Sequence, residues 1–456
     1  MLIIRHTMGV APRLTYRSWR SLLVLAVVGT LACSQAIGET AYPVGWGRQM
    51  GATGSDWCAA VTVDFAGNAY ISGYTPGSLD GSSAGGIDAF VAKYDPAGNR
   101  LWVRQHGSSG SDIVLGATSD ASGAVYLAGR TDGSLGGAVA GSSDLFLSKY
   151  DSDGTRLWTR QLGTSAYDTA SSVACGNGGV YVAGYSEGSL SGASAGGSDM
   201  VLVKYDPSGN RLWTRQYGSS ATDFANSVAV DSSGNAYVTG MTYGSLGAPN
   251  AGLREVFVAK YDASGTRLWT QQISSSIGDG YGVATDYAGN VFVTGVTAGN
   301  VLGDKVGDQD AFVAKYDPSG NLLWSRQFGT STAEQGRALA VDQLGNVFVT
   351  GYTYGALAGP ELSSLDDAFL VKFGPEGDML WSCQFGTSGG ESAWGTDVDD
   401  AGNVYVAGNT GRDLFGPNAG PLWASDAFLV RYEAPEPSTI AMLALGAITL
   451  AGRRRR

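Results

Sequence analysis

Histidine is almost absent from this chain, so acidic and aromatic side chains are the main candidates for catalysis or ligand binding. Among 456 residues the histidines are His6 and His106, and His6 lies in an N-terminal segment with the composition of an export signal. Ser-His-Asp catalysis, Cys-His nucleophiles and multi-histidine metal sites all need imidazoles. His106 replaces Leu162, Tyr217 or Phe328 of other copies of an internal repeat. We therefore predict no catalytic residues and a packing role for His106.

Carboxylates are abundant but show no catalytic pattern. Glycosidases use two facing carboxylates, and the 41 Asp and Glu residues offer no spacing that selects a pair. The run DSDG at residues 151–154 resembles the start of a calcium loop, which would make Asp151 and Asp153 metal ligands. The other ligand positions are absent, and an ordinary turn explains the same residues. We expect no cofactor, with calcium as the one ion left open.

Four aromatic residues could stack on sugar rings. Tyr243, Tyr354, Phe415 and Trp423 all lie in the segment that varies most between copies of the repeat. Variable loops on a rigid scaffold are suited to binding. These four are the candidate ligand-binding residues, and the alternative is that they fold back onto their own loops.

The tryptophans that position these segments recur at intervals of 55 to 57 residues, which no single catalytic site would require. The members of this row are Trp46, Trp102, Trp158, Trp213, Trp269, Trp324 and Trp381. Two more rows of seven accompany it, one beginning at Tyr70 (YISGYT) and one at Asp88 (DAFVAKYD). Such periods are typical of propellers and solenoids.

Each period contains four runs with the composition of strands. In the fourth copy they are residues 226–231, 235–240, 255–262 and 266–272, and Gly-rich turns join the first to the second and the third to the fourth. Apolar residues on both faces favour sheets packed between other sheets. We predict an all-β, seven-bladed β-propeller of four-stranded antiparallel blades over residues 42–433. Its first strands should line the central axis and its tryptophan strands the rim.

The phase of the repeat predicts how the ring closes. The first period begins with a lone tryptophan strand, Val44–Met50, and the last ends at Asp426–Tyr432 without one. The N-terminal strand should therefore pair with the last blade, which removes two exposed strand edges.

Residues that recur in every blade are expected to serve the fold. A basic row should pair with recurring acids: Lys93, Lys149, Lys204, Lys260, Lys315, Lys372 and Arg431. An acidic row at the entrance of the first strand should cap turns: Asp56, Asp112, Asp168, Asp223 and Asp279. Function is better sought where the period breaks, above all in the segments between second and third strands, which should emerge on one face of the disc.

Cysteine usage is sparse. Cys33 falls within the predicted signal, and Cys58, Cys175 and Cys383 remain, an odd number without CxxC spacing. This predicts neither a disulfide framework nor a zinc site, and three small core residues instead.

Both ends have the composition of targeting segments. Arginines precede an apolar run at residues 21–32, which predicts a signal peptide over residues 1–36; the alternatives are a lipoprotein modified at Cys33 and an uncleaved anchor. At the other end Pro435, Glu436 and Pro437 precede an apolar stretch at residues 438–452. Four arginines end the chain: Arg453, Arg454, Arg455 and Arg456. Arginines beyond an apolar segment stay cytoplasmic, so the preceding chain should be exported.

Residues 434–456 resemble the PEP-CTERM sorting tail of bacterial exosortase substrates, also described as the C-terminal motif of ice-binding proteins. That resemblance implies an exosortase-type partner that cuts near Pro-Glu-Pro and a transient stay in the cytoplasmic membrane. Residues 51–432 resemble the bacterial SBBP β-propeller repeats, whose blades follow D-G-N-x-Y-V-x-G-x-T, D-A-F-V-x-K-x-D and L-W. The third blade departs from this pattern at residues 174–182. This family is defined by its fold, so the resemblance implies no single activity.

Removing both termini leaves 21 basic against 41 acidic residues. Such a charge disfavours nucleic acids and anionic membranes as partners. We expect a non-enzymatic propeller at the cell surface or outside the cell. It should bind extracellular matrix or cell-surface polysaccharide or protein through one loop face. The alternatives are a carboxylate-based or calcium-dependent enzyme acting on polysaccharide, and a structural envelope protein without a specific ligand.

Overall fold

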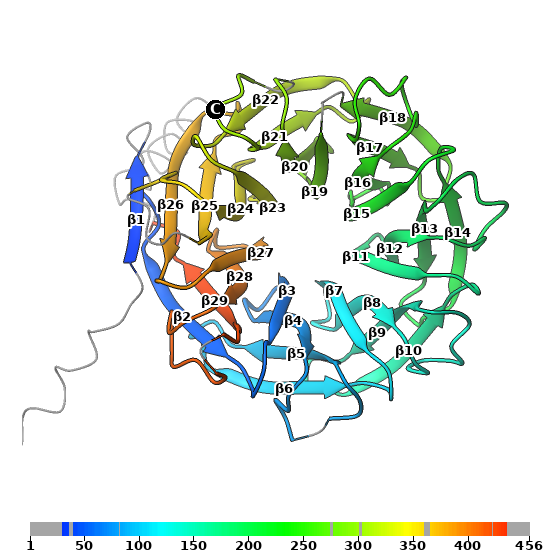
Figure 1. Cartoon of the computed structure of the whole chain (residues 1–456), viewed down its shortest axis with the longest axis horizontal. Coiled ribbons are helices and arrows are strands. Elements are labelled where there is room, and N and C mark those ends of the chain that lie inside the picture. The colour runs from blue at the N-terminus through cyan, green and yellow to red at the C-terminus, as the bar shows by residue number, and fades with distance from the viewer. Residues whose placement is uncertain are drawn as a thin grey trace, which may run out of the picture.

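The chain forms a closed ring of seven antiparallel sheets around a central opening (Figure 1). The computed structural model describes residues 30–35, 40–81, 83–273, 277–300, 303–359, 365–421 and 423–435, and all regular elements in these ranges are strands. This confirms the predicted seven-bladed, all-β propeller.

Each blade contributes one strand to each of four concentric rows. The innermost strands are β3 (Trp57–Val63), β7 (Asp112–Ser119), β11 (Asp168–Gly176), β15 (Asp223–Val230), β19 (Gly278–Thr285), β23 (Glu334–Val341) and β27 (Glu391–Val398). The second strands are β4 (Ala69–Thr75), β8 (Val125–Thr131), β12 (Gly179–Ser186), β16 (Ala236–Thr242), β20 (Val291–Thr297), β24 (Val347–Thr353) and β28 (Val404–Thr410). The third strands are β5 (Asp88–Tyr94), β9 (Asp144–Tyr150), β13 (Asp199–Tyr205), β17 (Glu255–Tyr261), β21 (Asp310–Tyr316), β25 (Asp367–Phe373) and β29 (Asp426–Tyr432). The rim strands are β6 (Arg100–His106), β10 (Arg156–Leu162), β14 (Arg211–Tyr217), β18 (Arg267–Ile273), β22 (Leu322–Phe328), β26 (Met379–Gly386) and β2 (Val44–Met50). The tryptophan strands thus form the rim, as predicted.

The core lies between neighbouring blades. The third strands β5, β21 and β25 are buried at every position, so both of their faces pack against other blades. Burial on both faces is why the four central residues of each of these strands are continuously apolar instead of alternating.

The ring closes as the phase of the repeat predicts. Strand β2 pairs antiparallel with β29, so that Trp46 lies opposite Arg431 and Met50 opposite Ala427. The two ends of the propeller therefore share blade seven, and its hydrogen bonds hold the ring shut.

The seam beside blade seven uses Tyr42 in place of a turn. Elsewhere a rim tryptophan and a lysine donate to the turn of the next blade, as Trp102 and Lys93 do to the Ser152 carbonyl. Blade seven has no such turn, because β29 and β2 come from opposite ends of the propeller. The Tyr42 ring lies 5.3 Å from the Trp381 ring, centroid to centroid, and this rim tryptophan is fully buried.

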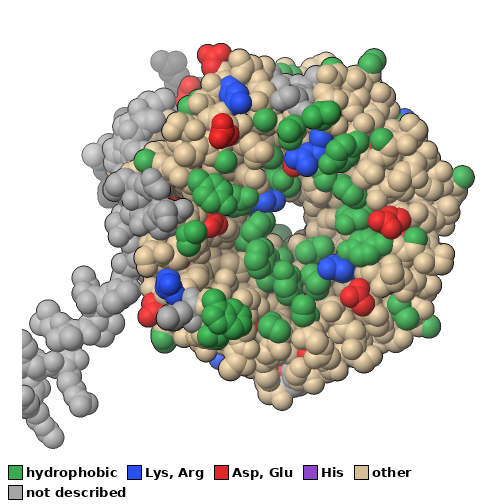
Figure 2. Space-filling view, in the orientation of Figure 1, with side chains coloured by type: hydrophobic (Ala, Val, Ile, Leu, Met, Phe, Trp, Pro, Cys, Tyr) green, Lys and Arg blue, Asp and Glu red, His purple; other side chains and the backbone are tan. Residues whose placement is uncertain are grey.

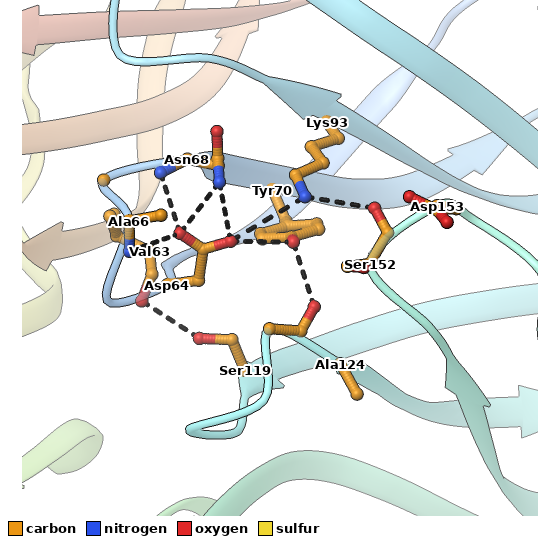
Figure 3. A network of polar contacts seen from close by, with 12 residues as sticks. Val63, Asp64, Ala66, Asn68, Tyr70, Lys93, Ser119, Ala124, Ser152 and Asp153 are labelled. Atoms are coloured by element: carbon orange, nitrogen blue, oxygen red, sulfur yellow. Dashed lines mark hydrogen bonds and ion pairs between the residues drawn. The ribbon is translucent and has the colours of Figure 1, made fainter.

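The basic row is structural, as predicted, and Figure 3 shows its contacts in blade one. Asp64 accepts hydrogen bonds from the backbone and amide of Asn68 and from the Tyr70 hydroxyl, the last at 2.9 Å. Lys93 Nζ lies 3.8 Å from Asp64 and 5.0 Å from the centroid of the Tyr70 ring. Its bond to Ser152 then joins blade one to blade two. The equivalent ion pairs are Lys149–Asp120 and Lys315–Asp286.

The prediction for the cysteines is wrong at one position. Strand β1 (Thr30–Gln35) pairs antiparallel with the rim strand β26, and the backbone of Cys33 lies opposite that of Cys383. Cys383 is disulfide-bonded, whereas Cys58 and Cys175 are free. The odd number counted in the sequence came from assigning Cys33 to the signal, and the ladder shows that Cys33 has a place beside the propeller.

The predicted targeting segments fall mostly outside the described residues. Of the sorting tail, Ala434 and Pro435 are described, whereas Glu436, Pro437 and Arg453 to Arg456 lie outside. Within the described ranges no helix is long and apolar enough to cross a membrane.

Candidate ligand-binding site

A β-bulge near the start of every inner strand places one extra residue at the same end of the central opening. The pairing of inner and second strands shifts across Arg337 in β23 and across Trp394 in β27. The equivalent residues of the other blades are Ala59, Leu115, Ser171, Asn226 and Tyr281. All seven line the opening, which has a volume of about 350 Å³. Bulges commonly re-aim side chains at functional sites, and this row changes in every blade.

The largest residues of this row gather in blades five to seven around one arginine. The Arg337 guanidinium carbon lies 4.1 Å from the ring centroid of Tyr281, 4.5 Å from that of Trp394 and 5.3 Å from that of Tyr352. Its Nη2 donates to the Tyr352 hydroxyl at 3.1 Å. These stacked contacts hold the planar cation at the mouth of the opening.

A cleft of about 400 Å³ lies beside this cluster, over blade seven, and three tryptophans line it. Trp57 of β3 and Trp394 of β27 have ring centroids 5.2 Å apart, and Trp423 comes from the loop between β28 and β29. Asp366 and Asn409 also line the cleft. Other polar lining residues are Ser388, Ser392, Arg412 and Ser425. Figure 2 shows hydrophobic side chains gathered around the opening on this face, with separate basic and acidic side chains among them.

Two buried polar atoms of lining residues have no hydrogen-bond partner. The Asn409 amide nitrogen donates to the Asp56 carbonyl at 2.8 Å, which fixes the amide, and its Oδ1 is unpaired. The indole Nε1 of Trp394 is also buried and unpaired. Unsatisfied buried groups are uncommon in folded proteins. Residues that line this cleft therefore contain one acceptor and one donor that are buried and unpaired.

The sequence-predicted aromatic candidates fall in different places. Trp423 is 79% exposed and lines the cleft. Tyr354 is 45% exposed and its ring lies 5.9 Å from that of Tyr352, next to the cluster around the arginine. Tyr243 is equally exposed but belongs to the loop of blade four. Phe415 packs inward, with its ring 6.1 Å from that of Phe428.

Sequence reasoning missed most of the site because it looked to the variable loops. The site residues outside the loops belong to the inner strands, whose sequences look alike from blade to blade. They are Trp57, Tyr281, Arg337 and Trp394. Aligning the bulge position would have revealed three of them, since Ala, Leu, Ser and Asn in blades one to four give way to Tyr, Arg and Trp in blades five to seven. What no alignment could show is that Trp57 and Trp394 line one cleft with Trp423.

The acidic row caps turns, with one exception. Asp112 accepts the Ser108 amide, and Asp56, Asp168 and Asp223 make the same bond. Asp279 was wrongly assigned to this row. Strand β19 begins with Gly278, which pairs with Thr297 where Asp112 pairs with Thr131.

Asp279, one residue later, lies on the opposite face of its strand and contacts residues at the mouth of the opening. It forms an ion pair with Arg254 Nε at 2.8 Å and accepts the Tyr281 hydroxyl at 2.8 Å. Burial raises the pKa of Asp279, while the Tyr281 hydroxyl and the charges of Arg254 and Arg337 oppose that shift. The Asp279 carboxylate therefore holds the Tyr281 ring, which stacks on Arg337.

The metal and imidazole candidates have ordinary structural partners. Asp151 Oδ1 accepts the backbone N–H groups of Asp153 and Thr155, as a turn requires. No group of three or more His, Cys, Asp or Glu side chains is placed to hold a metal in the part of the chain that the structure describes. His106 lies in the rim strand of blade one and hydrogen-bonds the Tyr150 hydroxyl.

Curated proteins match parts of this chain. A WD repeat-containing protein of Acanthamoeba polyphaga mimivirus is 26% identical over 254 residues, covering 41% of this chain and 18% of that protein. The regulatory protein FlaEY of Caulobacter vibrioides is 32% identical over 179 residues, covering 33% of this chain and 18% of that protein. The matches thus span under a fifth of either relative.

Solved structures align with this chain at low sequence identity. A gluconolactonase from Xanthomonas campestris aligns over 79% of this chain and 99% of its own, with 13% identity and a TM-score of 0.38.

Family comparisons match both the blades and the C-terminal end. The β-propeller repeat SBBP matches residues 45–80, 212–247, 268–303 and 323–357, and the PEP-CTERM protein-sorting motif matches residues 433–456. The matches cover the first two strands of blades one, four, five and six, and the other three blades have the same strand order. The chain is a seven-bladed propeller in which four stretches match the SBBP β-propeller repeat, and it carries a PEP-CTERM sorting motif.

Proposed function

We propose that this protein is exported and binds an extracellular or cell-surface polysaccharide in the cleft over blade seven. The observation that carries the proposal is the convergence of Trp57, Trp394 and Trp423 on one cleft of about 400 Å³. None of the three belongs to the recurring tryptophan row, so the fold does not require them there.

The chemistry of the lining suits a sugar. A pyranose ring has apolar C–H faces and a polar hydroxyl edge, and flat indoles supply apolar area with little loss of side-chain entropy. The unpaired Asn409 Oδ1 and Trp394 Nε1 would accept from and donate to ring hydroxyls. A hydroxyl is both donor and acceptor, so one sugar can satisfy both atoms.

The same lining favours binding over hydrolysis. Among the described residues that line the cleft Asp366 is the one carboxylate, and a glycosidase needs two across the scissile bond. Asp366 also accepts the Ser392 hydroxyl, which holds it in place as a recognition group. We therefore propose a non-enzymatic binding protein that needs no calcium.

The sorting motif supports the proposed location. A protein with this motif is a substrate for an exosortase-type sorting enzyme, which would place the propeller at the surface or release it. Intact mass of the surface or secreted protein should show the loss of Arg453 to Arg456; retention of all four would contradict the sorting role.

Binding is tested with the exported protein and the producing organism's own extracellular polysaccharide. Saturable binding in calorimetry, unchanged by a calcium chelator and without new reducing ends, is the expected result. New reducing ends would show a polysaccharide-active enzyme. Neither binding nor cleavage would leave a structural envelope role.

A further inference from the structure

Arg337 is an unusual arginine for this molecule because its hydrogen-bonding capacity is largely unused. The rim arginine Arg104 donates from Nε to Gly154, from Nη1 to Val103 and from Nη2 to Asp153, all backbone carbonyls. Arg337 makes one hydrogen bond, to the Tyr352 hydroxyl, and its buried Nε is unpaired. A guanidinium has five N–H donors, so most of its fork is free.

Arg337 also has no ion-pair partner among the described residues, unlike two other arginines at the same mouth. Arg254 pairs with Asp279 at 2.8 Å, and Arg130 pairs with Asp132 at 3.8 Å. The oxygens of Asp279 are already engaged by Arg254 and the Tyr281 hydroxyl. The charge of Arg337 also acts on the Asp279 carboxylate, but no described carboxylate oxygen lies within ion-pair distance of the guanidinium. A partly buried donor in this position loses hydration that the protein only partly replaces.

The distribution of charge points to the same face. Outside the two predicted targeting segments, sixteen of the 21 basic residues belong to the recurring interblade and rim rows. The other five are Arg130, Arg254, Lys305, Arg337 and Arg412, and all five lie at the mouth or in the loops around it. The rest of this acidic chain thus has few basic residues that could bind an anion. The basic residues that do not recur in every blade, and so are not needed for the fold, lie at the mouth.

We propose that Arg337 binds a carboxylate of the ligand, and hence that the polysaccharide is an acidic one built with uronic-acid units. The inference rests on the proposed function and names its substrate class. Trp394 lines both the cleft and the central opening, and Arg337 lines the opening and stacks on the same ring, so a polymer that extends from the cleft past the edge of Trp394 reaches the arginine. A planar guanidinium held by aromatic rings presents its N–H fork to a carboxylate in bidentate geometry, which a lysine cannot do.

The test compares the organism's extracellular polysaccharide with the same polymer after its carboxylates are reduced to alcohols. Wild type should bind the reduced polymer about 10- to 100-fold more weakly, the range expected for loss of a charged hydrogen-bonded contact. Arg337→Met should weaken binding to the acidic polymer by a similar factor and leave binding to the reduced polymer within about twofold. Arg337→Lys keeps the charge and the stem but loses the fork, and should recover part of the loss.

Arg326→Met is the matched control. Arg326 also stacks on a tryptophan, with its guanidinium carbon 5.8 Å from the centroid of Trp324, but at the rim. It should bind both polymers like wild type. Equal wild-type affinity for the two polymers, or equal losses for both in Arg337→Met with unchanged melting temperature, would overturn the proposal. Wild type that binds neither polymer would instead refute the proposed function.

Discussion

Replacing Trp423 with alanine tests the cleft without disturbing the fold. The side chain is 79% exposed, so its removal should cost little stability. A tryptophan offers up to about 250 Å², so about 200 Å² is accessible, and a sugar ring stacked on one face would cover about half of that. At about 25 cal/mol per Å², 100 Å² is worth about 2.5 kcal/mol, or about 70-fold in Kd.

Ordering of the ligand offsets part of this energy, so the expected loss is about 10- to 70-fold. Calorimetric titration with fragments of the extracellular polysaccharide measures it. Tyr287→Ala is the matched control, because Tyr287 is 78% exposed in the turn between β19 and β20, on the opposite face of the disc. A Trp423→Ala variant that binds within twofold of wild type, or an equal loss in Tyr287→Ala, would refute the assignment of the cleft.

Three further predictions concern the scaffold. Lys93→Met should lower the free energy of unfolding by about 1–3 kcal/mol in urea, because it leaves a buried carboxylate without its cation; a change below about 0.5 kcal/mol would contradict the structural role. Gly154 has φ +82° and an added Cβ would lie 2.9 Å from the Trp102 ring, so Gly154→Ala should cost more than Gly178→Ala, where φ is +70° and the space is open. Equal melting temperatures for these two variants would exclude the clash. Burial lowers the pKa of His106 to about 3, so between pH 6.5 and 3 the unfolded chain binds a proton that the folded chain does not. Stability should therefore fall as the pH falls through that window, by at most about 1.4 kcal/mol per unit, and His106→Phe should remove this component; an unchanged pH slope would contradict it.

The seven-bladed architecture can be predicted from the sequence alone, because a blade is a local unit repeated seven times. Tryptophan spacing, Gly-containing turns and apolar runs each report on contacts within one period of the chain. The lone strand at Val44–Met50 also fixed the closure, since only pairing with β29 completes the last blade. Recurrence identified the basic row as structural for the same reason: a contact made in every blade serves what every blade shares.

The residues that break the repeat form one site only because of how the chain folds in three dimensions. Trp57 and Trp394 are far apart in the chain and touch because closure brings blade one beside blade seven. A bulge in each inner strand turns Arg337 toward the opening, and a shift of one residue moves Asp279 from a turn cap to the mouth, because successive side chains of a strand point to opposite faces. The position of a residue within the repeat can be read from the spacing. The direction in which its side chain points depends on strand register, and ring closure brings together residues that are far apart in the sequence.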